Sequence, residues 1–130
     1  MDPMVFSGGD PRLESEIEVA RNGALHFRAP ADGARVAIYG PYVTLPAGEY
    51  RIELSLAVEE RTSGDMIVEL CRQKARIRIY ARRCFSWELD RGLIRISYPF
   101  GQGVEDLEIR LIVPAGFAGS ITQLAISRKI

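Results

Sequence analysis

The sequence predicts an all-β protein, folded as an antiparallel sandwich or barrel. Three observations predict this class. Short runs that alternate apolar and polar residues recur along the chain at a spacing of roughly ten residues. Gly, Pro, Asn and Asp residues separate these runs, as expected for turns. No segment carries the 3.6-residue apolar period of a confident helix.

Length and charge set the domain organisation and limit the partners. The chain has 130 residues, 47% hydrophobic and 26% charged, which is typical of one globular domain. We expect residues 1–12 to form a flexible N-terminal tail and residues 13–130 to form a single β-sandwich domain. Seventeen basic and seventeen acidic residues cancel, so nucleic acid is disfavoured as a partner. No apolar run approaches the ~20 residues that span a bilayer, so no membrane insertion is expected.

The N-terminal third of the chain contains three predicted elements. Residues 13–20 alternate weakly and predict a short strand or a single helical turn. Residues 24–28 and 35–40 each predict a strand, because each is an extended run that ends at a Gly or Pro turn signal.

The stretch "GPYVTLPAGEYRIEL" contains the clearest local signal. Residues 42–45 are predicted to be extended, and Pro46 and Gly48 then fit positions of a tight turn that favour these residue types. Residues 49–59 alternate with a period of two, which predicts a strand with one buried face. The residues expected to face inward are Tyr50, Ile52, Leu54, Leu56 and Val58.

The rest of the chain continues the same pattern. In residues 84–90, the alternating positions Phe85, Trp87 and Leu89 are grouped together, and we expect the two aromatic rings to pack in the core. Within residues 75–83, Ile77, Ile79 and Ala81 are expected inward, opposite Arg76, Arg78, Tyr80 and Arg82. The predicted strands of this half are 65–72, 75–83, 93–100, 106–113 and 120–130.

Residues with metal-binding or redox chemistry are scarce. Cys71 and Cys84 are too few for a disulfide scaffold, and we expect both to be free thiols, with Cys84 buried. His26 is the only histidine and lies within a predicted strand, so neither a zinc site nor a histidine-based triad is expected. The N-terminus lacks the basic and apolar regions of a secretory signal, so the cytoplasm is the expected compartment.

Acidic residues on strands leave one catalytic alternative. Glu53, Glu69 and Glu108 alternate with arginines, a pattern typical of cross-strand ion pairs on a solvated face. We therefore expect no enzymatic activity, no cofactor and no metal. The alternative is a hydrolase or lyase, which requires one of these carboxylates in a cleft beside another carboxylate with a raised pKa.

Two features could carry binding. Arginines fall mostly on the outward sides of predicted strands. They form either an ordinary solvent-facing surface or a surface that hydrogen-bonds polyhydroxylated or anionic ligands. Tyr80 lies among these arginines and could stack on a sugar ring, and Tyr42 adjoins a Gly-Pro turn. The loops "GPY", "RTSGD" and "PFGQGVED" form a single rim if the strands run up and down.

The stretch "YGPYVTLPAGEYRIELSL" resembles jelly-roll β-sandwich domains related to carbohydrate-binding modules and galactose-binding-like domains, as found in accessory modules of bacterial glycosyltransferases. The closing stretch "LEIRLIVPAGFAGSITQLAISR" is similar to the last two strands of those modules. The resemblance implies a non-catalytic jelly roll of about 8 to 10 strands and glycan recognition. Trp87 is the only tryptophan, whereas such modules usually expose a pair. The matching positions are Gly40, Pro41, Tyr42, Leu45, Pro46, Gly48, Tyr50 and Leu56.

The first hypothesis is therefore a module that binds carbohydrate through an Arg/Glu/Tyr sheet face. The alternative is a structural, oligomerisation or protein-interaction domain associated with polysaccharide biosynthesis, either as a homo-oligomer or attached to a sugar-processing enzyme. The residues expected to contact a glycan are Arg76, Arg78, Tyr80, Arg51, Glu53, Arg110 and Tyr42.

Overall fold

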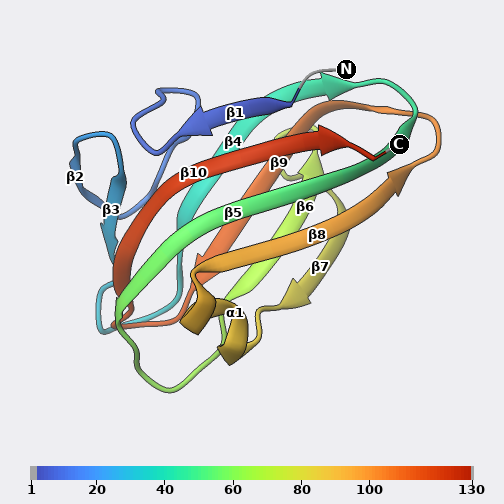
Figure 1. The fold of residues 1–130 in the computed structure, drawn as a ribbon. Helices are drawn as coiled ribbons and strands as arrows, with labels where there is room; N and C mark the ends of the chain where they lie inside the picture. The colour runs from blue at the N-terminus through green and yellow to red at the C-terminus, as the bar shows by residue number, and fades with distance from the viewer. Residues whose placement is uncertain (1–2, 130) are drawn as a thin grey trace.

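The protein is a sandwich of two antiparallel β-sheets. The computed structural model describes residues 3–129 and contains ten strands and one short helix (Figure 1). The predicted all-β, jelly-roll class is confirmed. No helix in residues 3–129 is long and apolar enough to cross a membrane.

Six strands form the larger sheet. Its order is β2-β3-β10-β5-β8, and β1 pairs with the same edge of β10 as β3, further along the strand. The strands are β1 (Met4–Ser7), β2 (Glu18–Arg21), β3 (Leu25–Arg28), β5 (Gly48–Glu60), β8 (Leu93–Phe100) and β10 (Ala118–Arg128).

Four strands form the smaller sheet, in the order β4-β9-β6-β7. Its strands are β4 (Arg35–Leu45), β6 (Ile67–Arg72), β7 (Ile77–Arg83) and β9 (Val104–Val113). The helix α1 (Ser86–Arg91) connects β7 of this sheet to β8 of the other sheet. In Figure 1, the β4–β5 and β8–β9 connections lie at one end of the sandwich, and the β5–β6 loop lies at the other.

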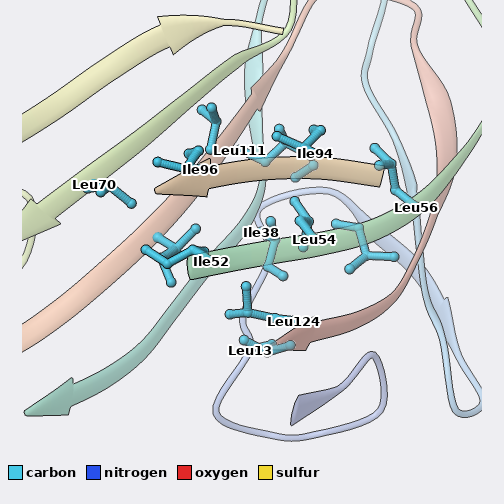
Figure 2. Close-up of a cluster of buried hydrophobic side chains, with 14 of the residues drawn as sticks. Leu13, Ile38, Ile52, Leu54, Leu56, Leu70, Ile94, Ile96, Leu111 and Leu124 are labelled. Carbon is cyan, nitrogen blue, oxygen red and sulfur yellow. The ribbon is translucent and has the colours of Figure 1, made fainter. Parts of the chain in front are cut away.

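Apolar side chains from both sheets form one core between them. The inward residues predicted for β5 are buried, apart from Val58, which is partly buried against the core. Figure 2 shows Ile52, Leu54 and Leu56 of β5 together with residues of the opposite sheet. A slip of one residue in the pairing of β5 would turn this whole set toward solvent, so the alternation fixes the register.

The turn between β4 and β5 is held by three contacts. The hydroxyl of Tyr50 donates to the carbonyl of Pro46 at 2.8 Å, and Arg128 donates to the carbonyl of Ala47 at 2.6 Å. From the β8–β9 loop, Gly103 packs so tightly that a Cβ atom there would lie 2.7 Å from the carbonyl oxygen of Leu45. The turn predicted from Pro46 and Gly48 is therefore held by one nearby residue, Tyr50, and by two residues far away in sequence.

The predicted flexible N-terminal tail is wrong in part. Residues 4–7 form β1 and pair with β10, and the ring of Phe6 is buried in the core. Residues 1 and 2 lie outside the described part of the chain. The prediction failed because a four-residue edge strand is too short to show a clear alternation, and pairing with β10 is a tertiary contact.

The expectation that Phe85 and Trp87 pack in the core is also wrong. Residues 86–91 form α1, whose side chains Glu88 and Leu89 point inward instead. Glu88 accepts a hydrogen bond from the backbone N–H of Phe85, and Gly92 ends the helix in a left-handed conformation with φ of 77°. A capping carboxylate and a C-terminal glycine thus set a short helix, which the spacing of the apolar residues in this segment did not indicate.

Candidate functional site

The residues predicted to contact a glycan do not share one face. Strand β5 pairs with β8 and β10, so Arg51 and Glu53 lie on the outer face of the six-stranded sheet. Arg78 and Arg110 lie on β7 and β9 of the four-stranded sheet, and Arg76 lies in the exposed turn before β7. The expected single Arg/Glu/Tyr face is therefore wrong, because these strands belong to opposite layers of the sandwich.

Tyr80 does not stand on the polar face with the arginines. A register shift between Leu70 and Cys71 places Tyr80 opposite Leu70, which is fully buried. Directly opposite residues in a ladder point to the same side, so Tyr80 points inward. Its ring centroid lies 5.5 Å from that of Tyr98, at an interplanar angle of 52°. The irregularity in the β6–β7 ladder cannot be seen in the alternation of residues 75–83.

The outer face of the four-stranded sheet carries a ladder of ion pairs, which we call the Glu/Arg ladder: Glu69, Arg78, Glu108 and Arg110. Arg110 contacts Glu108 at 3.0 Å and Glu69 at 3.3 Å. Arg78 contacts Glu69 at 2.9 Å. The two carboxylates are buried, while the side chain of Arg78 is 67% exposed. The ladder therefore uses most of its hydrogen-bonding capacity within the protein.

The groups next to the two carboxylates of the ladder are buried or half-buried. Cys71, directly opposite Glu108, is buried, and burial raises the pKa of its thiol to about 11. Tyr42 is half-buried beside the ladder, and burial together with the charge of Glu108 raises the pKa of its hydroxyl to about 12. One carboxylate oxygen of Glu108 has no hydrogen-bond partner in residues 3–129, but it too is buried.

A second polar region lies at the end of the sandwich, where the β6–β7 turn meets the β8–β9 loop. Two adjoining cavities of about 270 and 250 Å³ share Arg72, Gly103 and Val104, and we call them together the rim cleft. Ile77, Ile79, Pro99, Phe100 and Gly101 complete the less polar cavity. Gln73, Gln102, Glu105 and Asp106 complete the polar one.

The polar side chains of the rim cleft are free, in contrast to those of the ladder. Arg72, Gln73, Gln102, Glu105 and Asp106 make no side-chain hydrogen bond or ion pair with any described residue. The backbone beside them is unusual, because three consecutive residues of the β6–β7 turn adopt positive φ angles of 54°, 54° and 67°. Non-glycine residues in this conformation cluster at ligand-binding sites and turns.

The loops do not form the single rim expected from the sequence. The loop "PFGQGVED" contributes to the rim cleft, but "RTSGD" lies at the other end, where the hydroxyl of Thr62 donates to the carbonyl of Ala115. The segment "GPY" lies within β4 rather than in a loop. The loop after β8 was thus indicated by the sequence, whereas its proximity to Arg72 and Gln73 was not.

Helix α1 exposes the two aromatic residues expected in the core. Phe85 is 49% exposed and Trp87 is 57% exposed, and their rings are nearly parallel, with an interplanar angle of 6° and centroids 6.1 Å apart. A buried ion pair holds the helix in place, because the two Nη atoms of Arg82 each donate to a carboxylate oxygen of Glu88 at 2.8 Å. Burial opposes ionisation of Glu88, but the hydrogen bonds from Arg82 and Phe85 outweigh it and lower its pKa.

The carboxylates considered for catalysis are all ion-paired. Glu53 contacts Arg95 at 3.0 Å, and Glu69 and Glu108 belong to the ladder. None of the three lines the rim cleft. In the described part of the chain, no three His, Cys, Asp or Glu residues are grouped closely enough to hold a metal ion.

Comparison with known proteins supports the fold independently. No protein-family model matches the chain, and no curated protein matches it by sequence. Solved structures do match. The C-terminal CBM6 of LamC, a marine laminarinase from Zobellia galactanivorans, superposes with a TM-score of 0.56 at 10% identity, covering 98% of this chain and 100% of that chain.

Two further structures show the same similarity. TmCBM61 in complex with β-1,4-galactotriose gives a TM-score of 0.50 at 16% identity, covering 98% of this chain and 88% of the other. The Glycosylation Associate Protein (Gap123) complex from Streptococcus agalactiae gives 0.61 at 9% identity, and there this chain corresponds to 26% of that chain. The chain thus has the β-sandwich fold of carbohydrate-binding modules.

Proposed function

We propose that this protein is a non-catalytic carbohydrate-binding module whose ligand site is the rim cleft. The fold similarity to CBM6 and CBM61 modules supports the class of protein. It does not choose a surface, because one fold carries different binding sites in different proteins. The choice of surface rests on the side chains of this chain.

The observation that carries the proposal is the free hydrogen-bonding capacity of the rim cleft. Arg72 offers donors only, Glu105 and Asp106 offer acceptors, and Gln73 and Gln102 offer both. A sugar hydroxyl both donates and accepts, so this mixed set suits it. The half-buried side chains of Ile77 and Ile79 add an apolar wall for the C–H face of a sugar ring, which matches the usual composition of ligand sites.

Two other surfaces compete with the rim cleft as the glycan site. The first is the Glu/Arg ladder, where the exposed Arg78 lies on the same sheet face as Arg110. Its weakness is that Arg78 and Arg110 are already ion-paired. The second is the pair of exposed rings on α1, which could stack on a sugar.

The test is a glycan array on the intact protein, followed by calorimetry of the strongest ligand with three variants. We expect Arg72→Ala to weaken binding at least ~10-fold, because a hydrogen bond to a charged group contributes about 1.5–3 kcal/mol. We expect Arg78→Ala and Trp87→Ala to bind within about twofold of the unchanged protein. A blank array removes the proposed function, and a loss confined to Arg78→Ala or Trp87→Ala moves the site to the ladder or to α1.

A second candidate function is protein interaction through α1. The observation that favours it is the exposed Phe85–Trp87 pair with Arg91 4.9 Å from the Trp87 ring, since Trp and Arg are enriched at the energetic centres of interfaces. If the chain self-associates there, light scattering of the unchanged protein shows an oligomer that Trp87→Ala converts to a monomer. A monomer at all concentrations removes self-association.

A further inference from the structure

A cavity with a cationic lining lies at the end of β10, outside the rim cleft and the Glu/Arg ladder. Its volume is about 300 Å³, and it is lined by Arg51, Ser127, Arg128 and Lys129. Arg51 projects from β5, and Ser127 and Arg128 are the last two residues of β10, which pairs with β5. Two arginines from neighbouring strands, together with Lys129 directly after β10, therefore line one cavity.

Arg51 has no partner in the described structure. It forms neither a hydrogen bond nor an ion pair with residues 3–129, and its Nε atom is buried. The carboxylate two residues along the same face, Glu53, contacts Arg95 at 3.0 Å instead. The cross-strand neighbours of Arg51 are Ser127 and Ser97, whose short side chains carry no charge. The Nη atoms of Arg51 are not buried and also have no partner among the described residues, so they are the donors that a ligand can reach.

The other two cations are only partly engaged. Arg128 donates one hydrogen bond to the carbonyl of Ala47, which is a neutral acceptor. Lys129 lies 3.9 Å from the carboxylate of Glu49, at the limit of an ion pair, and the Glu49 side chain is half-exposed. Glu49 is the one acid in contact with the described pocket residues, so the three cations leave a local positive surplus in a chain of zero net charge.

We propose that this pocket binds an oxyanion, namely a carboxylate, sulfate or phosphate group. A guanidinium presents planar donors that match such groups, and charge-assisted hydrogen bonds to them are short and strong. The oxyanion would accept from the Nη atoms of Arg51 and from the hydroxyl of Ser127, and Arg128 and Lys129 would neutralise its charge. Anion binding would also relieve the mutual repulsion of the three cations.

The position of the pocket indicates which molecule carries the oxyanion. The pocket and the rim cleft lie on either side of the β4–β5 turn, because Arg128 contacts Ala47 and Gly103 packs against Leu45. A saccharide with an acidic substituent, bound in the rim cleft, would place that group toward Arg51. Oxyanion binding follows from the residues of the pocket alone. The identification of the oxyanion as part of an acidic glycan rests on the proposed function.

The first experiment is a calorimetric or NMR titration of the intact protein with sodium sulfate and with sodium glucuronate at low ionic strength. We expect saturable binding that Arg51→Gln weakens at least ~10-fold, because it removes charge-assisted hydrogen bonds. The matched control is Arg83→Gln, which removes the same charge from an exposed position on the other sheet and is expected to change affinity less than about twofold. Lys129→Gln provides a second pocket variant if Arg51→Gln does not fold.

The outcomes distinguish a failed pocket from a failed function. Absence of saturable anion binding, or equal losses in Arg51→Gln and Arg83→Gln, overturns the pocket. If anions bind at Arg51 but no glycan on the array binds, the oxyanion pocket is supported and the proposed carbohydrate-binding function is rejected. An acidic oligosaccharide that is weakened by both Arg51→Gln and Arg72→Ala assigns the oxyanion to a glycan, whereas sensitivity to Arg51→Gln alone assigns it to a free anion.

Discussion

The Glu/Arg ladder and the rim cleft are built from similar polar side chains, yet they differ in where those side chains find partners. In the ladder, Arg110 joins two buried carboxylates, and nearly every polar atom is satisfied inside the protein. In the rim cleft, Arg72 and its polar neighbours make no side-chain hydrogen bond with described residues. The difference teaches that polar residues on a sheet serve stability when they pair with one another and are available for binding when they do not.

The largest effect is expected from the centre of the ladder. Replacing Arg110 by Ala leaves the buried carboxylates Glu108 and Glu69 without their shared partner, and we expect a loss of about 3 kcal/mol in the free energy of unfolding. Urea denaturation measures this loss. The double variant Glu108→Leu/Arg110→Met should be more stable than Arg110→Ala, because it removes a buried charge together with its partner. If Arg110→Ala is as stable as the unchanged protein, the ladder is not a stabilising network.

Thiol reactivity is the next sharpest contrast between the two regions. Because the pKa of the Cys71 thiol is raised from 9.0 to about 11 by burial, its thiolate fraction at pH 8 is about 100-fold below that of an ordinary thiol. We expect native Cys71 to resist alkylation at pH 8, as does Cys84, while a cysteine introduced in the cleft by Gln102→Cys reacts at the rate of an exposed thiol. Mass spectrometry of the alkylated protein locates the label.

The same raised pKa predicts a dependence of stability on alkaline pH. The folded state binds the Cys71 proton more tightly than the unfolded state, so this stabilisation is complete below pH 9 and is lost as the pH rises toward 11. Cys71→Ala should show a shallower decline than the unchanged protein between pH 9 and pH 11. Identical declines would mean that the site beside the ladder is open to water.

In the rim cleft, we expect the free energy of unfolding to depend on a glycine rather than on a charged residue. Gly103 has a φ of 77°, and an added Cβ would lie 2.7 Å from the carbonyl oxygen of Leu45. We therefore expect Gly103→Ala to lower the free energy of unfolding by about 2 kcal/mol and to weaken glycan binding by moving the loop. Calorimetry and urea denaturation test both effects. Gly101→Ala is the matched control, since no atom lies within 4 Å of its added Cβ.

The smallest effect is expected at the exposed end of the ladder. Arg78 contacts Glu69, but its side chain is 67% exposed, so we expect Arg78→Ala to change the free energy of unfolding by at most about 0.5 kcal/mol. A loss as large as that of Arg110→Ala would show that the ladder acts as one cooperative unit. Chemical denaturation of the two variants side by side makes the comparison.

The sequence by itself determined most of the strands, the inward residues of β5 and the turn at Pro46 and Gly48. These features are local: a side-chain period of two and the backbone preferences of Pro and Gly can be read from a few adjacent residues. For this reason the buried set that begins with Tyr50 and Ile52 was predicted correctly, apart from the partial exposure of Val58.

Only the tertiary structure decided which polar residues meet. The register shift beside Leu70 turned Tyr80 inward, and the layer assignment separated Arg51 from Arg78. The rim cleft joins Arg72 to the loop at Gln102, and the pocket joins Arg51 to the end of β10. Strand pairing and sheet stacking bring together residues far apart in the chain, and alternation along one strand carries no information about its neighbours.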